Sequence, residues 1–181
     1  SEVERIKREL ERLLKEVKDA NKRVKDTLRK LLRDVEEMNR RVKRENHELL
    51  RRLDELVKAG RDEETIKKVK RESRELLREL AKVNRDVKER IEELLREVKK
   101  LNEDVKRKLR ELLKELEERI RDEELLKDVR KVAKEVEEEL KKLHDDTKRV
   151  ADKVKEDLDR LHRDSERNAR RSEEEMDKRR K

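Results

Sequence analysis

The stretch NRDVKERIEELLREVKKL, residues 84–101, decides the fold of this chain. At 100° per residue, its Asn, Val, Ile and Leu side chains fall within an arc of about 120° on a helix. Aligned copies of the same pattern begin at Val3, Asn21, Asn39, Ile66 and Asn102. Each copy completes about five whole turns at 3.6 residues per turn, so the apolar stripe stays on one side of the helix. We therefore expect long, nearly straight α-helices.

The width of this arc predicts how many neighbours each helix has. An arc of about 120° is wide enough for contact with two other helices and too narrow for burial on all sides. The remaining surface is Lys, Arg, Glu and Asp, with oppositely charged pairs such as Glu92 and Arg96 four residues apart. We expect three such helices to close on one another and to keep their charged faces in water.

Composition alone would favour disorder, because 61% of the 181 residues are charged and none is aromatic. The periodicity overrules that interpretation, since a disordered chain has no reason to keep Leu and Val at a fixed angle. The length suits one domain. We predict that residues 1–181 form a single domain.

Two breaks in the stripe divide the chain into three helices. The first helix is expected over residues 2–59, with Ser1 as its N-cap and Gly60, the only glycine in the sequence, just beyond its end. The second is expected over residues 62–120, with Asp62 as its N-cap.

The second break contains neither Gly nor Pro and is recognised by a change of phase. The stripe restarts at Leu126, and the tetrad RDEE at 121–124 repeats the RDEE at 61–64. Asp122 is therefore expected to cap a third helix over residues 122–178. With short connections, three helices of about 85 Å run up, down and up. The predicted fold is all-α, a single-chain antiparallel three-helix bundle, and it is expected to be a monomer because two neighbours use each arc completely.

Polar residues interrupt the stripe of every helix, and the register that pairs Val57 with Ile66 brings them to common levels. The levels hold Asn21, Asn102 and His144; Asn39, Asn84 and His162; and, more loosely, Asn46, Ser73 and Asn168. Matched polar groups predict buried hydrogen-bond networks that fix the register. The alternative is that these side chains lie at the edge of the arc, about 40° from its centre, and contact water.

The sequence predicts no catalytic, cofactor-binding or metal-binding residue, and hence no enzyme. His144 and His162 are too far apart to share a metal, no acid is expected inside the stripe, and no Ser stands beside a base. The chain has no cysteine. The net charge of +8 comes from 59 basic and 51 acidic residues that are mixed along the chain, without aromatics to stack on bases, so nucleic acid is not an expected partner. No segment is apolar enough for a membrane span or a signal peptide. We expect a soluble protein, cytoplasmic if made in cells, that requires no partner.

The repeats, the RDEE turns, the lack of aromatics, the Leu and Val core and the matched Asn and His levels resemble a de novo designed, parametrically built three-helix bundle. The resemblance covers the whole chain, but it is one of style and carries no functional residue with it. It implies a structural scaffold without natural biochemical activity.

A second hypothesis starts from the third helix, whose stripe turns polar after His162, at Ser165, Asn168, Ala169, Ser172 and Met176. If this end is weakly packed, it opens a groove that binds a partner helix. If His144 and His162 are buried as neutral partners of Asn, the same chain is a pH-responsive switch. The competing expectation is a frayed C-terminus.

Overall fold

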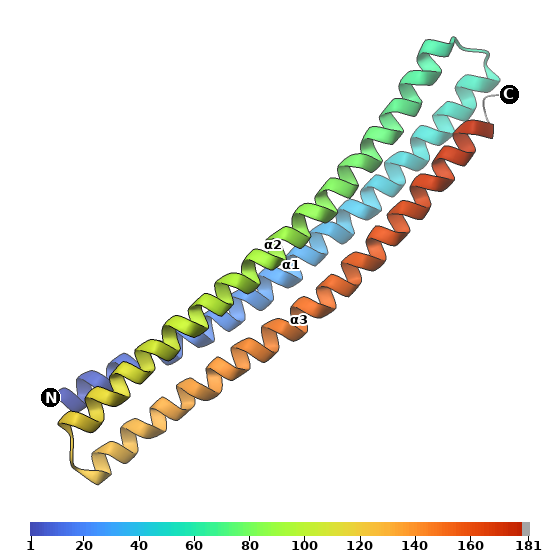
Figure 1. Ribbon diagram of the computed structural model, residues 1–181. Coiled ribbons are helices and arrows are strands. Elements are labelled where there is room, and N and C mark those ends of the chain that lie inside the picture. The colour runs from blue at the N-terminus through green and yellow to red at the C-terminus, as the bar shows by residue number, and fades with distance from the viewer. Residues whose placement is uncertain (179–181) are drawn as a thin grey trace. The chain divides into compact units, whose positions relative to one another are not determined.

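The computed structural model describes residues 1–178, and the last three residues of the predicted domain lie outside this range. It contains three α-helices, α1 (Glu2–Lys58), α2 (Glu63–Arg119) and α3 (Glu123–Lys178), shown in Figure 1. Each end lies within one residue of the predicted end. The predicted all-α class is confirmed.

Each helix begins at the predicted N-cap. Ser1 Oγ accepts a hydrogen bond from the N–H three residues on at 3.4 Å, and Asp62 Oδ1 accepts one from the N–H of Thr65 at 3.1 Å. Asp122 Oδ1 accepts a hydrogen bond from the N–H two residues on at 3.0 Å. These side chains satisfy donors that the first turn of a helix leaves without partners.

α1 ends at Gly60, whose φ of 65° lies in the left-handed region. The Gly60 N–H donates to the Val57 carbonyl at 3.2 Å, and the Arg61 N–H donates to the Leu56 carbonyl at 3.1 Å. This pair of bonds is the Schellman arrangement, which a residue without Cβ adopts most easily.

The described residues divide into two compact units, and each contains one segment of every helix. Unit 1 comprises Ser1–Arg29 and Ile91–Asp152. Unit 2 comprises Lys30–Arg90 and the described residues from Lys153 onward.

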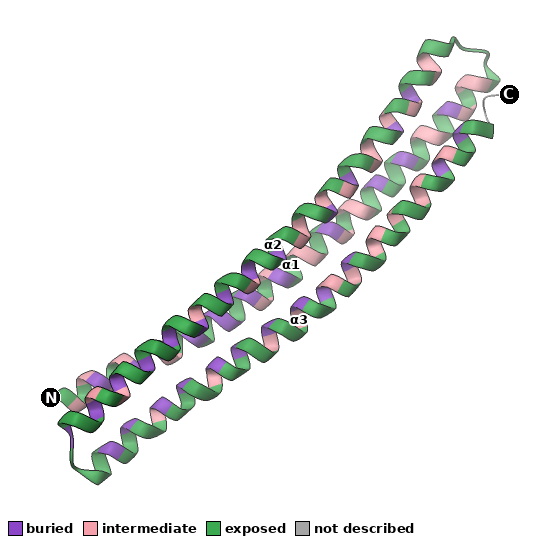
Figure 2. Cartoon of the chain, viewed as in Figure 1, coloured by how far each residue is buried: buried purple, intermediate pink, exposed green. Residues whose placement is uncertain are grey.

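In unit 1 all three segments carry buried residues, coloured purple in Figure 2, and the buried apolar side chains form the core. Its largest fully buried side chains are Ile6, Leu10, Leu28, Ile91, Leu116, Leu140 and Leu143. An ion pair of 3.9 Å between Glu117 and Arg130 joins α2 to α3, and one of 3.4 Å between Lys25 and Asp146 joins α1 to α3.

Unit 2 has a more open core. Leu53, Val69 and Met176 form a buried cluster, but the apolar side chains around it are only half-buried. These are Leu49, Leu50, Leu56, Val57 and Ile66. α3 remains helical to Lys178 and Met176 is 1% exposed, so within the described residues the expectation of a frayed C-terminal end is wrong. The buried thioether of Met176 anchors this end of α3.

The contacts between α2 and α3 in unit 2 show an antiparallel register. The predicted levels pair Asn102 with His144 and Asn84 with His162, and this register places Arg74 opposite residue 172 and Lys88 opposite residue 158. Arg74 Nε lies 2.7 Å from Glu173 Oε1, and Lys88 Nζ lies 2.5 Å from Asp159 Oδ1. Both contacts are one residue from the predicted position.

Over residues 1–178, no helix is both long and apolar enough to cross a membrane.

Candidate functional site

A buried polar network joins all three helices of unit 2. Asn46 on α1, Ser73 on α2 and Ser172 on α3 are each at most 2% exposed. Ser73 Oγ donates to Asn46 Oδ1, and Asn46 Nδ2 donates to Ser172 Oγ at 2.8 Å. Ser172 Oγ in turn donates to the backbone carbonyl of Asn168 at 2.9 Å. We call Asn46, Ser73 and Ser172 the three-helix network.

The network ties the relative position of the helices to hydrogen bonding. The Asn46 amide offers one acceptor and one donor group, and each contacts a different helix. Moving one helix by a single turn shifts its side chains by about 5.4 Å, which is more than a hydrogen bond tolerates. Such a slip would leave buried polar atoms without partners.

Three side chains had been expected at this level, and the structure joins two of them, Asn46 and Ser73. Asn168 takes part through its backbone carbonyl, while its residue as a whole is half-buried. Sequence reasoning missed Ser172 as the third member. The predicted register was the available signal, since it places Ser73 opposite residue 173 rather than residue 168.

A second polar cluster lies between α1 and α3 of unit 1. Asn21 Nδ2 and Lys25 Nζ each lie 3.4 Å from Asp146 Oδ2, and Arg149 lies 3.4 Å from Asp146 Oδ1. Burial raises the pKa of Asp146, but the hydrogen bonds from Asn21 and Lys25 and the nearby positive charge outweigh it, so the pKa is lowered. An acid therefore takes the position that sequence reasoning had assigned to a histidine.

His144 is exposed, which corrects its expected burial with Asn21 and Asn102. Asn102 is buried, with 8% exposure. The buried side chains of α3 nearby, Leu140 and Leu143, lie about 40° and 100° to one side of His144 around the helix. The buried side of α3 thus does not include His144, although the corresponding positions of α1 and α2, Asn21 and Asn102, are buried.

The structure does not bring Asn39, Asn84 and His162 together through any hydrogen bond among the described residues. Asn39 Nδ2 donates to the Val35 carbonyl of its own helix at 2.7 Å. His162 is about one-third exposed, and its Nε2 lies 2.8 Å from Glu166 Oε1. Asn84 is 1% exposed, and neither polar atom of its amide has a partner in residues 1–178. Neither histidine is thus buried beside an Asn, and the burial on which the hypothesis of a pH switch depended is not observed.

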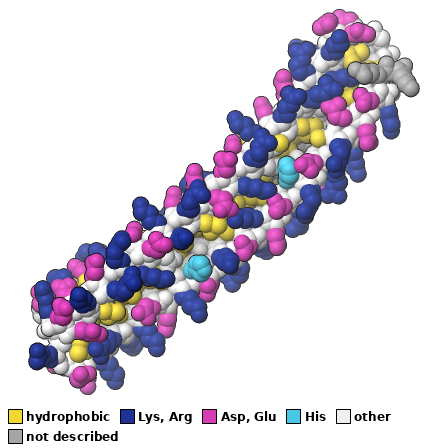
Figure 3. Space-filling model, in the orientation of Figure 1, with side chains coloured by type: hydrophobic (Ala, Val, Ile, Leu, Met, Phe, Trp, Pro, Cys, Tyr) yellow, Lys and Arg dark blue, Asp and Glu magenta, His cyan; other side chains and the backbone are white. Residues whose placement is uncertain are grey.

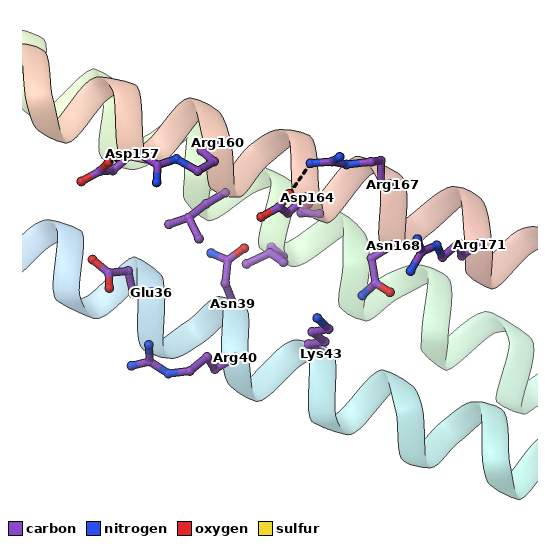
Figure 4. Close-up of a pocket in the computed structure, with 13 residues that line it drawn as sticks. Glu36, Asn39, Arg40, Lys43, Asp157, Arg160, Asp164, Arg167, Asn168 and Arg171 are labelled. Carbon is purple, nitrogen blue, oxygen red and sulfur yellow. Dashed lines mark hydrogen bonds and ion pairs between the residues drawn. The ribbon is translucent and has the colours of Figure 1, made fainter.

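A groove runs between α1 and α3 in unit 2, and we call it the α1–α3 groove. Its first part has a volume of about 640 Å³ and is lined by Asn39, Lys43, Leu80, Leu161 and Asn168 among others. In Figure 4 the amides of Asn39 and Asn168 point into the space between the two helices. Its second part, of about 740 Å³, adjoins the first and reaches Leu50 and Ser172.

The outer surface carries both charges. In the view of Figure 3, Lys and Arg side chains alternate with Asp and Glu, and hydrophobic side chains show between them. Many of the ion pairs join residues three or four apart on one helix, and exposed pairs of this kind add little stability. No group of three or more His, Asp or Glu side chains in residues 1–178 is placed to hold a metal ion.

No protein-family model matches the sequence, and no curated protein sequence matches it. A solved structure described as a computationally designed three helix bundle is similar in fold, with a TM-score of 0.58 and 21% sequence identity. The match covers 98% of this chain and 88% of that chain. This chain has a three-helix bundle fold. At this identity the likeness establishes the fold of the bundle and carries no function to it.

Proposed function

We propose that the bundle is a designed structural scaffold, a single-domain monomer without natural biochemical activity, whose register is fixed by buried polar side chains. The three-helix network carries the proposal, because Asn46, Ser73 and Ser172 come from three different helices and satisfy one another. The regular 18-residue repeats of the sequence and its similarity in fold to a designed bundle support the designed origin.

The energetics of such a network favour specificity over stability. A hydrogen bond within a protein adds only about 0.5–1.5 kcal/mol net, but a buried polar group left without a partner costs about 1–3 kcal/mol. A core of Leu alone would tolerate neighbouring registers with similar energy. In a shifted register, Asn46 and its two hydroxyl partners would be buried without hydrogen bonds, so that register is less stable.

The proposal is tested with the triple variant Asn46→Leu, Ser73→Ala, Ser172→Ala. Because the chain has no cysteine, Glu75→Cys on α2 and Glu174→Cys on α3 provide two exposed spin-label sites in unit 2. Electron–electron double resonance then measures the distance between the labels. We expect one narrow distance in the parent and a broadened or second distance in the triple variant, without loss of helicity.

The matched control is Asn84→Leu, which removes a buried amide of the same unit that has no hydrogen-bond partner in the described chain. It should keep the single distance of the parent. A triple variant that also keeps the single narrow distance would show that the network does not fix the register.

A further inference from the structure

We propose that the α1–α3 groove of unit 2 is a docking site for an acidic amphipathic helix of a partner protein. This function goes beyond that of a scaffold, and the register experiment above does not depend on it.

The groove has the dimensions of a helix seat. Its two parts share Arg40, Lys43, Asn168 and Arg171 and are therefore continuous. Along α1 the lining extends from Glu36 to Leu50, which is roughly 22 Å at 1.5 Å per residue. That length accommodates about four turns of a docked helix.

The floor of the groove is incompletely covered because α3 carries small or polar residues here. Ser165 and Asn168 line the groove at positions that hold Val one or two repeats earlier in the helix, and both are half-buried. Leu161 of α3 and Leu50 of α1 line the groove and are also half-buried. A docked helix with Leu or Ala on one face would cover this apolar surface, and a polar residue on it would meet the amides of Asn39 and Asn168.

The walls of the groove carry six Lys or Arg and five Asp or Glu side chains, Glu36 and Glu175 included, so positive charge is in slight excess. Two of its carboxylates are paired along their own helices, Asp157 with Arg160 at 2.6 Å and Glu48 with Arg51 at 2.8 Å. Asp164 is paired with Arg167 in the same way, as the dashed line in Figure 4 shows. Within residues 1–178, no ion pair is formed by the four cations that line the centre of the groove. These are Arg40, Lys43, Arg44 and Arg171.

These features select among the possible occupants. A second copy of the chain carries the same net charge of +8 and would bring like charges together. A nucleic acid would neutralise the cations but would leave Leu50 and Leu161 uncovered. An amphipathic helix with Asp and Glu beside its apolar face satisfies both the charge and the apolar floor.

The probe is a fluorescein-labelled 18-residue helical peptide with a Leu stripe and flanking Glu residues, and fluorescence anisotropy measures its binding to the full chain. One comparison peptide replaces Glu by Lys, and another keeps Glu but replaces Leu by Ser. We expect saturable binding of the first peptide and at least about tenfold weaker binding of the other two. Hydrogen exchange should slow over residues 36–50 and 157–175 when the first peptide is bound.

The protein variant Arg40→Glu, Lys43→Glu, Arg171→Glu reverses charge in the groove. The matched control, Lys67→Glu, Arg71→Glu, Arg85→Glu, makes the same change in net charge at exposed positions of α2 that line none of the described hollows. The groove variant should bind the first peptide at least about tenfold more weakly, and the control should remain within about threefold of the parent. Circular dichroism checks that both stay helical, and the peptide comparisons require no change to the protein.

Four results would overturn the proposal. They are no saturable binding of the first peptide, equal losses in the two protein variants, equally tight binding of the peptide without Leu, and concentration-dependent self-association that protects the groove without peptide. The second and third results would indicate diffuse attraction to a basic surface, and the last would make a second copy the occupant.

Discussion

At the scale of single residues, two buried asparagines of unit 2 differ in what their amides contact. The amide of Asn46 donates to Ser172 and accepts from Ser73. The amide of Asn84 has no partner in the described chain, although the residue is 1% exposed. A buried polar group without a partner loses its hydration and gains nothing in return.

We predict that Asn84→Leu raises the free energy of unfolding by about 1–3 kcal/mol, because it removes this penalty and adds apolar burial. Asn46→Leu should lower it, since two buried hydroxyls lose their partner. Urea titrations of both variants show whether the free energy of unfolding rises in the first and falls in the second. A destabilising Asn84→Leu would mean that the amide is satisfied in solution.

Asp146 makes a pH-dependent contribution to stability. Its pKa is lowered in the folded state, so its contribution is complete above the unfolded pKa of about 3.9 and is lost as the pH falls through the folded pKa. Asp146→Asn should therefore destabilise the bundle at pH 7 and have little effect near pH 2. Urea titrations at both values test this, with the exposed neighbour substitution Asp145→Asn as control. An equal effect of Asp146→Asn at both values would contradict the assigned ion pairs.

At the scale of the helix, α2 shows how well the apolar arc predicts burial. Leu94 and Val98 lie inside the arc and are each 5% exposed, whereas Leu95, at its edge, is half-buried. The helix ends were predictable because Asp62, Gly60 and Asp122 satisfy backbone groups locally. The partner of a residue at the edge of the arc was not predictable, because a small rotation of the helix decides whether it is buried.

We predict that Leu94→Ala lowers the free energy of unfolding by about 2–5 kcal/mol, because it leaves a cavity in the core of unit 1. Lys99→Ala, on the exposed face of the same helix, should change it little. Chemical denaturation of both variants measures the difference. Similar effects at the two positions would mean that the arc is assigned wrongly.

At the scale of the whole molecule, the two units bury their apolar residues to different extents. Unit 1 is closed by Leu and Val from all three helices, while α3 contributes Ser165, Asn168 and Ala169 to unit 2. Local opening requires less free energy where fewer apolar contacts must be broken.

Amide hydrogens of residues 161–170 should therefore exchange before those of residues 126–143 on the same helix. Hydrogen-exchange mass spectrometry at neutral pH gives the order. Ser172 and Met176 are both 1% exposed, and the segment around them should be slower than residues 161–170. Slowest exchange in residues 161–170 would contradict both the weak packing and the open groove.

The proposed monomer follows from the closure of the three stripes within one chain. Sedimentation equilibrium should give a mass of 22.3 kDa that does not change with concentration. A stable dimer or trimer would show that the half-buried side chains of unit 2, such as Leu49 and Leu50, are covered by another copy.

The sequence by itself determined the helices, their ends and their antiparallel order, because these depend on a repeated angle and on caps that act within a few residues. It also located the polar positions of the core. Only the tertiary structure decided which of them meet, since this depends on how far each helix is rotated and shifted against its neighbours. A rotation of α3 leaves His144 exposed, and Asn46 takes the hydroxyl of Ser172 as its partner instead of the Asn168 side chain. Packing of many side chains fixes these small displacements, and no single stretch of sequence contains them.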